Sequence, residues 1–232
     1  MAVTLHKSKR WLDETTPSFL IKIFEEDEQR LKKFDDELAS KARAIYRAAH
    51  RSGGESVNSN LTRIDARISA YARKIPDNDL PQKIISREGA PPTDFTPVLH
   101  FSNLPSAIIS ERFAACLMEL ELEKHQLSPI VVEDFDKKVV GHAYFWRPMI
   151  TLDAIDLNST RIAFTKKDDI ANSTCRLNYG EGNFLKKNVI DGHLAWADAR
   201  CILTLFISDA FLEILSSRQI DDFSCDHKLK EI

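Results

Sequence analysis

The stretch Pro129-Ile-Val-Val-Glu-Asp-Phe-Asp-Lys-Lys-Val-Val-Gly-His-Ala-Tyr-Phe-Trp146 decides the fold class of this chain. Two runs rich in β-branched and aromatic residues, 129–132 and 139–146, flank the polar segment Asp-Phe-Asp-Lys-Lys. Runs of this composition favour strands, and the short polar segment between them predicts a β-hairpin. Further strands are expected at residues 98–101, 161–164 and 201–207.

Two strand-to-helix junctions have similar sequences, Ile108-Ile-Ser-Glu-Arg-Phe113 and Phe206-Ile-Ser-Asp-Ala-Phe211. In each, a serine can cap the free amides of a helix, and the acid that follows complements the helix dipole. We therefore interpret Ser110 and Ser208 as helix caps. A nucleophilic serine needs an activating base, and neither segment has a histidine close in sequence.

The N-terminal third has the periodicity of helices, from about residue 13 to residue 75. A break at Ser-Gly-Gly, residues 52–54, separates two amphipathic patterns and predicts a helical hairpin. The apolar stripe of the first helix could pack within the chain or between two copies, as a homodimer. The first pattern comprises Phe24, Leu31, Leu38 and Ile45, with Leu20 and Phe34 between them, and the second comprises Leu61, Ile64, Ile68, Tyr71 and Ile75.

Prolines at 76, 81, 91, 92 and 97 predict a linker without regular structure, because proline lacks an amide donor. The expected domains are a helical hairpin region at 1–75, a Pro-rich linker at 76–97 and an α/β domain at 98–232. The fold class is α+β: an N-terminal helical hairpin plus a C-terminal mixed α/β domain with a mainly antiparallel sheet.

Composition predicts a globular, cytoplasmic protein. Of 232 residues, 43% are hydrophobic and 29% are charged. The basic start is not followed by the apolar run of a secretory signal, and residues 201–207 are too short an apolar stretch to span a membrane. The four cysteines have no CxxC spacing, which is typical of buried thiols in a reducing compartment.

No catalytic, cofactor-binding or metal-binding residue is expected. Asp153 and Asp156 could divide acid and base work, but their neighbours are apolar and a turn-and-cap role is favoured. Gly180-Glu-Gly-Asn183 lacks the spacing of a phosphate-binding loop, and the seven histidines have no metal-ligand spacing.

Charge is unevenly distributed: residues 1–97 carry a net charge of +2 and residues 98–232 a net charge of −5. The acidic half suits a basic partner. Trp196 either contacts that partner or seals the edge of the core. The acidic candidates are Glu133, Asp134 and Asp136 on one turn, and Asp221 and Asp222 after the last helix.

Three fragments resemble a family of bacterial immunity proteins found beside polymorphic toxins. They are Leu104-Pro-Ser-Ala-Ile-Ile-Ser110, Tyr144-Phe-Trp-Arg-Pro-Met-Ile-Thr-Leu-Asp-Ala-Ile-Asp156, and Leu205-Phe-Ile-Ser-Asp209 with Phe223. The resemblance covers about residues 98–223, and the N-terminal hairpin departs from the family's usual organisation. It implies binding to a cognate protein toxin delivered by contact-dependent or type VI-like secretion, and it supplies no catalytic residues.

A basic helical face supports an alternative. Residues 38–75 have a net charge of +6, and their arginines recur at helical spacing near Tyr46 and Tyr71. Such a face could bind nucleic acid as a regulator, although a solvated face or one that docks on the acidic half is the favoured interpretation. A hydrolase built on Ser110 or Asp153 and Asp156 is the least supported hypothesis. The face comprises Arg43, Arg47, Arg51, Arg63 and Arg67.

Overall fold

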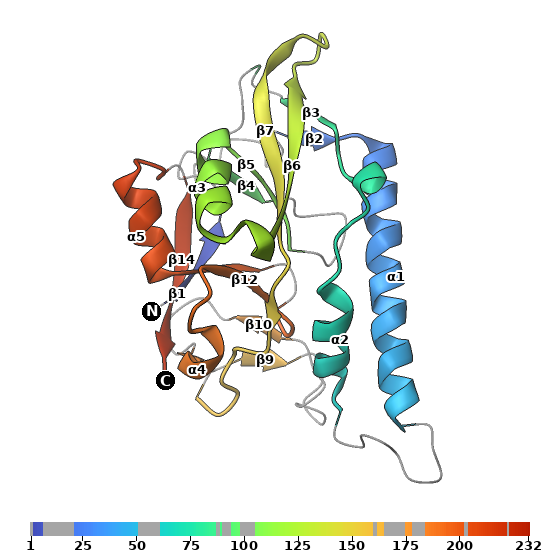
Figure 1. Ribbon diagram of the computed structural model, residues 1–232, viewed down its shortest axis with the longest axis vertical. Coiled ribbons are helices and arrows are strands. Elements are labelled where there is room, and N and C mark those ends of the chain that lie inside the picture. Colours follow the sequence, from blue (N-terminus) through green and yellow to red (C-terminus); the bar gives the residue numbers. More distant parts are fainter. Residues whose placement is uncertain are drawn as a thin grey trace.

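The structure, a computed structural model, contains two six-stranded sheets and five α-helices among the residues that it describes (Figure 1). The predicted α+β class is confirmed. A two-stranded sheet pairs β9 (Ile162–Phe164) with β10 (Cys175–Leu177). The described residues are 2–6, 21–50, 61–86, 89, 94–97, 105–159, 162–164, 175–177, 184–201, 204–221 and 223–232.

One sheet has the order β2-β3-β6-β7-β5-β4. Neighbouring strands are antiparallel except for β3 and β6, which are parallel. The expected hairpin at 129–146 is its centre, and both of its strands are longer than the sequence predicts. The strands are β2 (Ile21–Ile23), β3 (Lys83–Ser86), β4 (Phe95–Pro97), β5 (Ala107–Ile109), β6 (His125–Glu133) and β7 (Val139–Pro148).

The other sheet has the order β11-β14-β1-β13-β12-β8. It is also mainly antiparallel, with parallel pairs at its two edges, β11 with β14 and β12 with β8. The sequence predicts one sheet, whereas the described residues form two six-stranded sheets and the two-stranded β9–β10 sheet. The strands are β1 (Ala2–His6), β8 (Thr151–Leu152), β11 (Phe184–Leu185), β12 (Ala195–Asp198), β13 (Leu205–Ser208) and β14 (Ser224–Glu231).

Alternation along the strands separates three apolar cores. Ile109 and Trp146 belong to a central core together with Ile207, whereas Ile108 and Phe145 face the N-terminal helices. In the second sheet Phe206 points away from the central core, into a third cluster. The central core therefore joins residues of both sheets with the helices α3 (Glu111–Glu121) and α5 (Asp209–Ser217).

Both serine caps are confirmed. The hydroxyl of Ser110 accepts from the amide of Phe113, and that of Ser208 accepts from the amide of Phe211, each at 3.2 Å. The two junctions also meet in space, because the rings of Phe113 and Phe211 pack edge to face with centroids 5.8 Å apart. The sequence similarity thus reflects two strand-to-helix units that pack against each other in one core.

The N-terminal helical hairpin is confirmed as α1 (Glu25–His50) and α2 (Arg63–Tyr71), which lie side by side in Figure 1. Leu31, Phe34 and Leu38 are buried against the β6–β7 sheet, so this part of the apolar stripe packs within the chain, whereas Phe24 is exposed. A homodimer through these helices stays a prediction. The short helix α4 (Lys187–Ile190) and the 3₁₀ turns at Asp77–Asp79 and Leu122–Lys124 complete the described helical elements.

Helical structure from about residue 13 is wrong at Ile21–Ile23, which form strand β2, paired with β3. Strand β1, at Ala2–His6, also lies in the region expected to be a helical hairpin. The absence of regular structure expected for 76–97 is wrong at Lys83–Ser86 and Phe95–Pro97. The sheet accepts Pro97 because β4 is an edge strand and needs no donor on its outer side.

The strand expected at 201–207 begins only at Leu205, because the amide of Cys201 donates to the Asp198 carboxylate within a turn. The whole strand expected at 98–101 lies outside the described residues, as does Gly180-Glu-Gly-Asn183. Within the described ranges, no helix is long and apolar enough to cross a membrane.

Candidate partner-binding surfaces

The turn between β6 and β7 forms the uppermost part of the molecule in Figure 1. We call residues 134–139 the hairpin tip. Phe135 is 65% exposed and Val139 is 52% exposed. The hairpin tip therefore presents an aromatic and an aliphatic side chain to solvent next to the exposed Asp136.

Asp134 shapes this turn. Its carboxylate oxygen Oδ1 accepts from the amides of Asp136 and Lys138, both at 2.9 Å. Lys137 has a φ of 63°, in the left-handed region that a tight turn often requires. Glu133 is buried and accepts from Lys83 Nζ at 2.6 Å on the neighbouring strand β3. Of the three predicted acidic contacts here, two have structural partners and Asp136 is left exposed.

A groove of about 410 Å³ lies between α1 and α2, and we call it the arginine groove. Four of the five arginines of the predicted basic face line it, and Arg51 lies outside the described residues. Sequence spacing placed these arginines on two helix faces, and the packing of the hairpin turns the two faces toward each other. The lining comprises Ala39, Ala42, Arg43, Tyr46, Arg47, Arg63, Ile64, Arg67 and Tyr71.

Aromatic rings hold two of these arginines. The guanidinium carbon of Arg63 lies 5.2 Å from the ring centroid of Tyr46, and that of Arg67 lies 4.6 Å from the ring centroid of Tyr71. Tyr71 is itself fixed, because its hydroxyl donates to buried Asp35 at 2.9 Å, and burial raises its pKa well above the usual value. Cation–π contacts of this kind orient the planar guanidinium groups.

Buried Arg147 joins α2 to the sheet. Its guanidinium donates to the carbonyl oxygens of Tyr71 and Arg73, at the end of α2. Burial lowers the pKa of Arg147 to about 10, so the side chain stays charged at neutral pH. Arg147 lies on strand β7, and it thereby holds α2, which forms one wall of the arginine groove, against the sheet.

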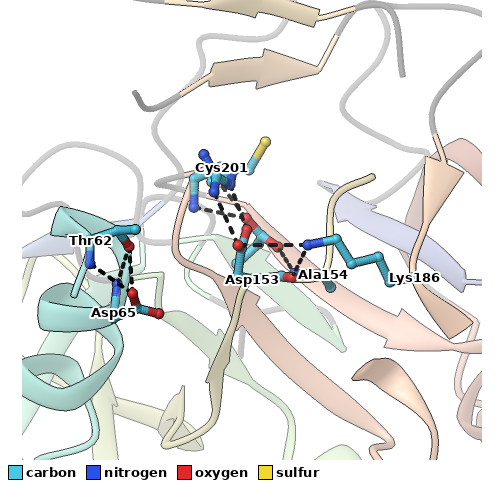
Figure 2. A network of polar contacts seen from close by, with 8 residues as sticks. Thr62, Asp65, Asp153, Ala154, Lys186 and Cys201 are labelled. Carbon is cyan, nitrogen blue, oxygen red and sulfur yellow. Dashed lines mark hydrogen bonds and ion pairs between the residues drawn. The ribbon is translucent and has the colours of Figure 1, made fainter. Parts of the chain in front are cut away.

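A second polar network surrounds Asp153 (Figure 2). Arg200 donates to both carboxylate oxygens of Asp153, at 2.5 and 3.0 Å, and Lys186 Nζ donates to the Asp153 carbonyl oxygen at 3.1 Å. The Asp156 carboxylate accepts from the amide of Ser159 at 2.7 Å. Asp156 therefore has the turn-and-cap role that the sequence favours over acid–base chemistry, whereas Asp153 forms ion pairs that the sequence did not predict.

Asp198 is the buried centre of the same turn. Its carboxylate accepts from the amides of Ala154 at 2.9 Å, Arg200 at 2.8 Å and Cys201 at 3.2 Å. Burial raises its pKa to about 6, although these hydrogen bonds favour the charged form. The carboxylate is fully enclosed by the backbone that it organises, so the raised pKa reflects a structural role.

Ser110 is likewise occupied. Its hydroxyl donates to Asp94 at 2.7 Å, and Asp94 in turn accepts two hydrogen bonds from Arg112. This carboxylate ties the residues before β4 to the start of α3. No group of three or more candidate metal ligands occurs within the described residues.

The remaining predicted contacts are separated in the structure. Trp196 has no exposed surface and stacks on Phe206 with centroids 5.8 Å apart, so the structure places it in the core. Asp221 is exposed after α5, whereas Asp222 lies outside the described residues. Sequence reasoning missed Phe135, although a phenylalanine within the polar Asp-Phe-Asp-Lys-Lys turn is a pattern that predicts an exposed aromatic.

These features define a class: an α+β protein with a projecting aromatic hairpin and a basic groove, in which the candidate nucleophile and paired acids have structural partners. Comparison with family models identifies it further. The model of the Imm11 immunity protein family matches residues 29–227, which is most of the chain, and the chain belongs to this family. No curated protein matches it.

The family match corrects the extent of the resemblance. Residues 98–223 were expected to carry it alone, but the matched range also includes almost all of α1 and the whole of α2. The helical hairpin is therefore a regular part of the family, and the expectation that it departs from the family is wrong. Membership indicates a role in immunity to a toxin.

Proposed function

We propose that this protein neutralises a cognate protein toxin by direct, stoichiometric binding. The observation that carries the proposal is the family match over residues 29–227. Immunity by binding requires surface and affinity, and it requires no reacting group. The occupied state of Ser110, Asp153 and Asp156 supports this mode of action.

The hairpin tip is the contact that we propose for the toxin. Exposed aromatic residues at the end of a rigid element are typical anchors of protein interfaces, since they bury large area at little entropic cost. Phe135 is such a residue, and Asp134 holds its turn in shape. Asp136, with Asp221 and Asp222, would add charge that orients a basic toxin surface during association.

The toxin would act in the cytoplasm, after delivery by contact-dependent or type VI-like secretion. The protein would then meet it there, without a cofactor. Within the part of the chain that the structure describes, no helix could span a membrane. The gene directly upstream is the first candidate for the cognate toxin.

Co-expression tests the proposal. Cells that express the upstream toxin gene should grow when they also express this protein, and Phe135→Ala should reduce that rescue. Leu122→Ala is the matched control, because Leu122 is another exposed apolar residue, at 53% exposure, outside the hairpin tip. Full rescue by folded Phe135→Ala would remove the hairpin tip from the interface, and failure of the wild type would contradict direct immunity against that toxin.

Charge reversal tests the acidic residues separately. Asp221→Lys with Asp222→Lys should weaken the rescue, mainly by slowing association with the toxin. With purified proteins, the decrease in association rate should therefore be larger at low ionic strength. Unchanged rescue would exclude these two residues from the contact.

A further inference from the structure

The arginine groove combines a concentration of positive charge with an apolar floor. Arg43 and Arg47 stand one turn apart on α1, and both are exposed. Like charges at this spacing destabilise a helix slightly, and a bound anion would offset that cost. Among the described residues that line the groove, none is acidic.

Guanidinium groups favour particular anions. Their planar, forked donors match carboxylates and phosphates through paired hydrogen bonds. Arg67 is oriented by its contact with the ring of Tyr71 on the opposite side of the groove from Arg43 and Arg47. Donors from two helices therefore converge on one space, which suits a ligand with several acidic groups.

The aromatic rings of the groove argue against a nucleic acid. Single-stranded nucleic acids stack their bases on open aromatic faces. Tyr46 has Arg63 over its ring and His50 beside it with centroids 4.2 Å apart, and Tyr71 is only 4% exposed. Arg63 covers a face of Tyr46 and Tyr71 is nearly fully buried, whereas the half-buried Ala39 and Ala42 offer apolar contacts to an amino-acid side chain.

We propose that the arginine groove binds a short acidic segment of a partner protein, with glutamate or aspartate side chains on the arginines and an apolar side chain on the floor. The proposal stands apart from the proposed function, because it concerns the chemistry of the groove and is tested on the purified protein alone. It gives the α1–α2 hairpin a binding role besides its packing on the sheet.

Fluorescence anisotropy with a labelled peptide of alternating glutamate and leucine provides the test. The same peptide with glutamine in place of glutamate and a single-stranded oligonucleotide of equal charge serve as comparison probes. The acidic peptide should bind more tightly than both, with an affinity that falls as salt is raised. Equal binding of the glutamine peptide, or tighter binding of the oligonucleotide, would overturn the proposal.

Variants locate the binding. Arg43→Glu with Arg47→Glu should weaken binding of the acidic peptide by about tenfold or more. Lys33→Glu with Lys41→Glu is the matched control, since both lysines are exposed on α1, neither lines the groove and the charge change is the same. Equal weakening by the two pairs would show a general charge effect and overturn the site. If the Arg43→Glu and Arg47→Glu changes disturb folding, Arg43→Gln with Arg47→Gln replaces them. This pair removes the positive charges without adding negative ones, so we expect a smaller loss of affinity for the acidic peptide.

Discussion

Arg147 fastens the C-terminal end of α2 to strand β7. It is buried, and its guanidinium supplies donors to two carbonyl oxygens at the end of that helix. Arg147→Met should lower the free energy of unfolding by about 2–4 kcal/mol, because both carbonyls would lose charged donors. Urea denaturation measures this. Arg73→Ala, at an exposed side chain of the same turn, should stay within about 0.5 kcal/mol of the wild type; equal effects would contradict this role.

The raised pKa of Asp198 predicts that the free energy of unfolding depends on pH. Its pKa of about 6 in the folded protein lies above the ordinary value of 3.8, so the folded state binds the proton more tightly than the unfolded state. Its contribution to the free energy of unfolding is therefore complete below about pH 4 and is lost as the pH rises toward and through about 6.

Asp198→Asn removes this titration. The free-energy difference between wild type and variant should then shrink as the pH rises from about 4 to about 6, as measured by urea denaturation at each pH. A difference that stays constant or grows over this range would show that the carboxylate titrates normally.

At the scale of the element, the two serine caps contribute different amounts to the free energy of unfolding. Ser208→Ala should cost about 1 kcal/mol, the usual loss of an N-cap. Ser110→Ala should cost more, because its hydroxyl also donates to buried Asp94. Thermal or urea unfolding checks the order. Folded Ser110→Ala should still protect cells from the toxin, and loss of protection without loss of stability would revive a catalytic role for Ser110.

Local patterns predicted the elements whose partners are near in sequence. The β6–β7 hairpin, the caps of α3 and α5 and the hairpin of α1 and α2 all follow from spacing and capping residues. Strand β14 was not predicted, because Ser-Cys-Asp-His-Lys-Leu-Lys-Glu is mostly polar. It gains its structure by pairing with β1, more than 200 residues away in sequence, and with β11, whose paired residues are 46 positions away.

The candidate surfaces were predicted only in part, because they too depend on packing between elements. Helical spacing placed Arg43 with Arg47 and Arg63 with Arg67, but only the packing of two helices shows that they line one groove. The acidic turn was located correctly, yet charge alone did not distinguish the structural Asp134 from the exposed Asp136. Trp196 was open to two interpretations because one sequence cannot reveal which face of a strand is covered.

At the scale of the whole molecule, the proposed division at residues 75 and 97 can be tested by truncation. Strand β1 lies between β14 and β13, and β3 lies between β2 and β6. A chain that begins at residue 98 would lack strands β1, β2, β3 and β4 and would expose the core that α1 covers. We expect it to be insoluble or expanded by size-exclusion chromatography. A compact, cooperatively unfolding product would establish 98–232 as an independent domain.

Titration of the purified cognate toxin with this protein tests the central claim of direct, stoichiometric neutralisation most directly. Toxin activity should fall in proportion to the protein added and vanish near equimolar amounts, with a stable complex in calorimetry that Phe135→Ala weakens. Complete inactivation of the toxin by a small fraction of an equivalent, or inactivation without any complex, would contradict the account.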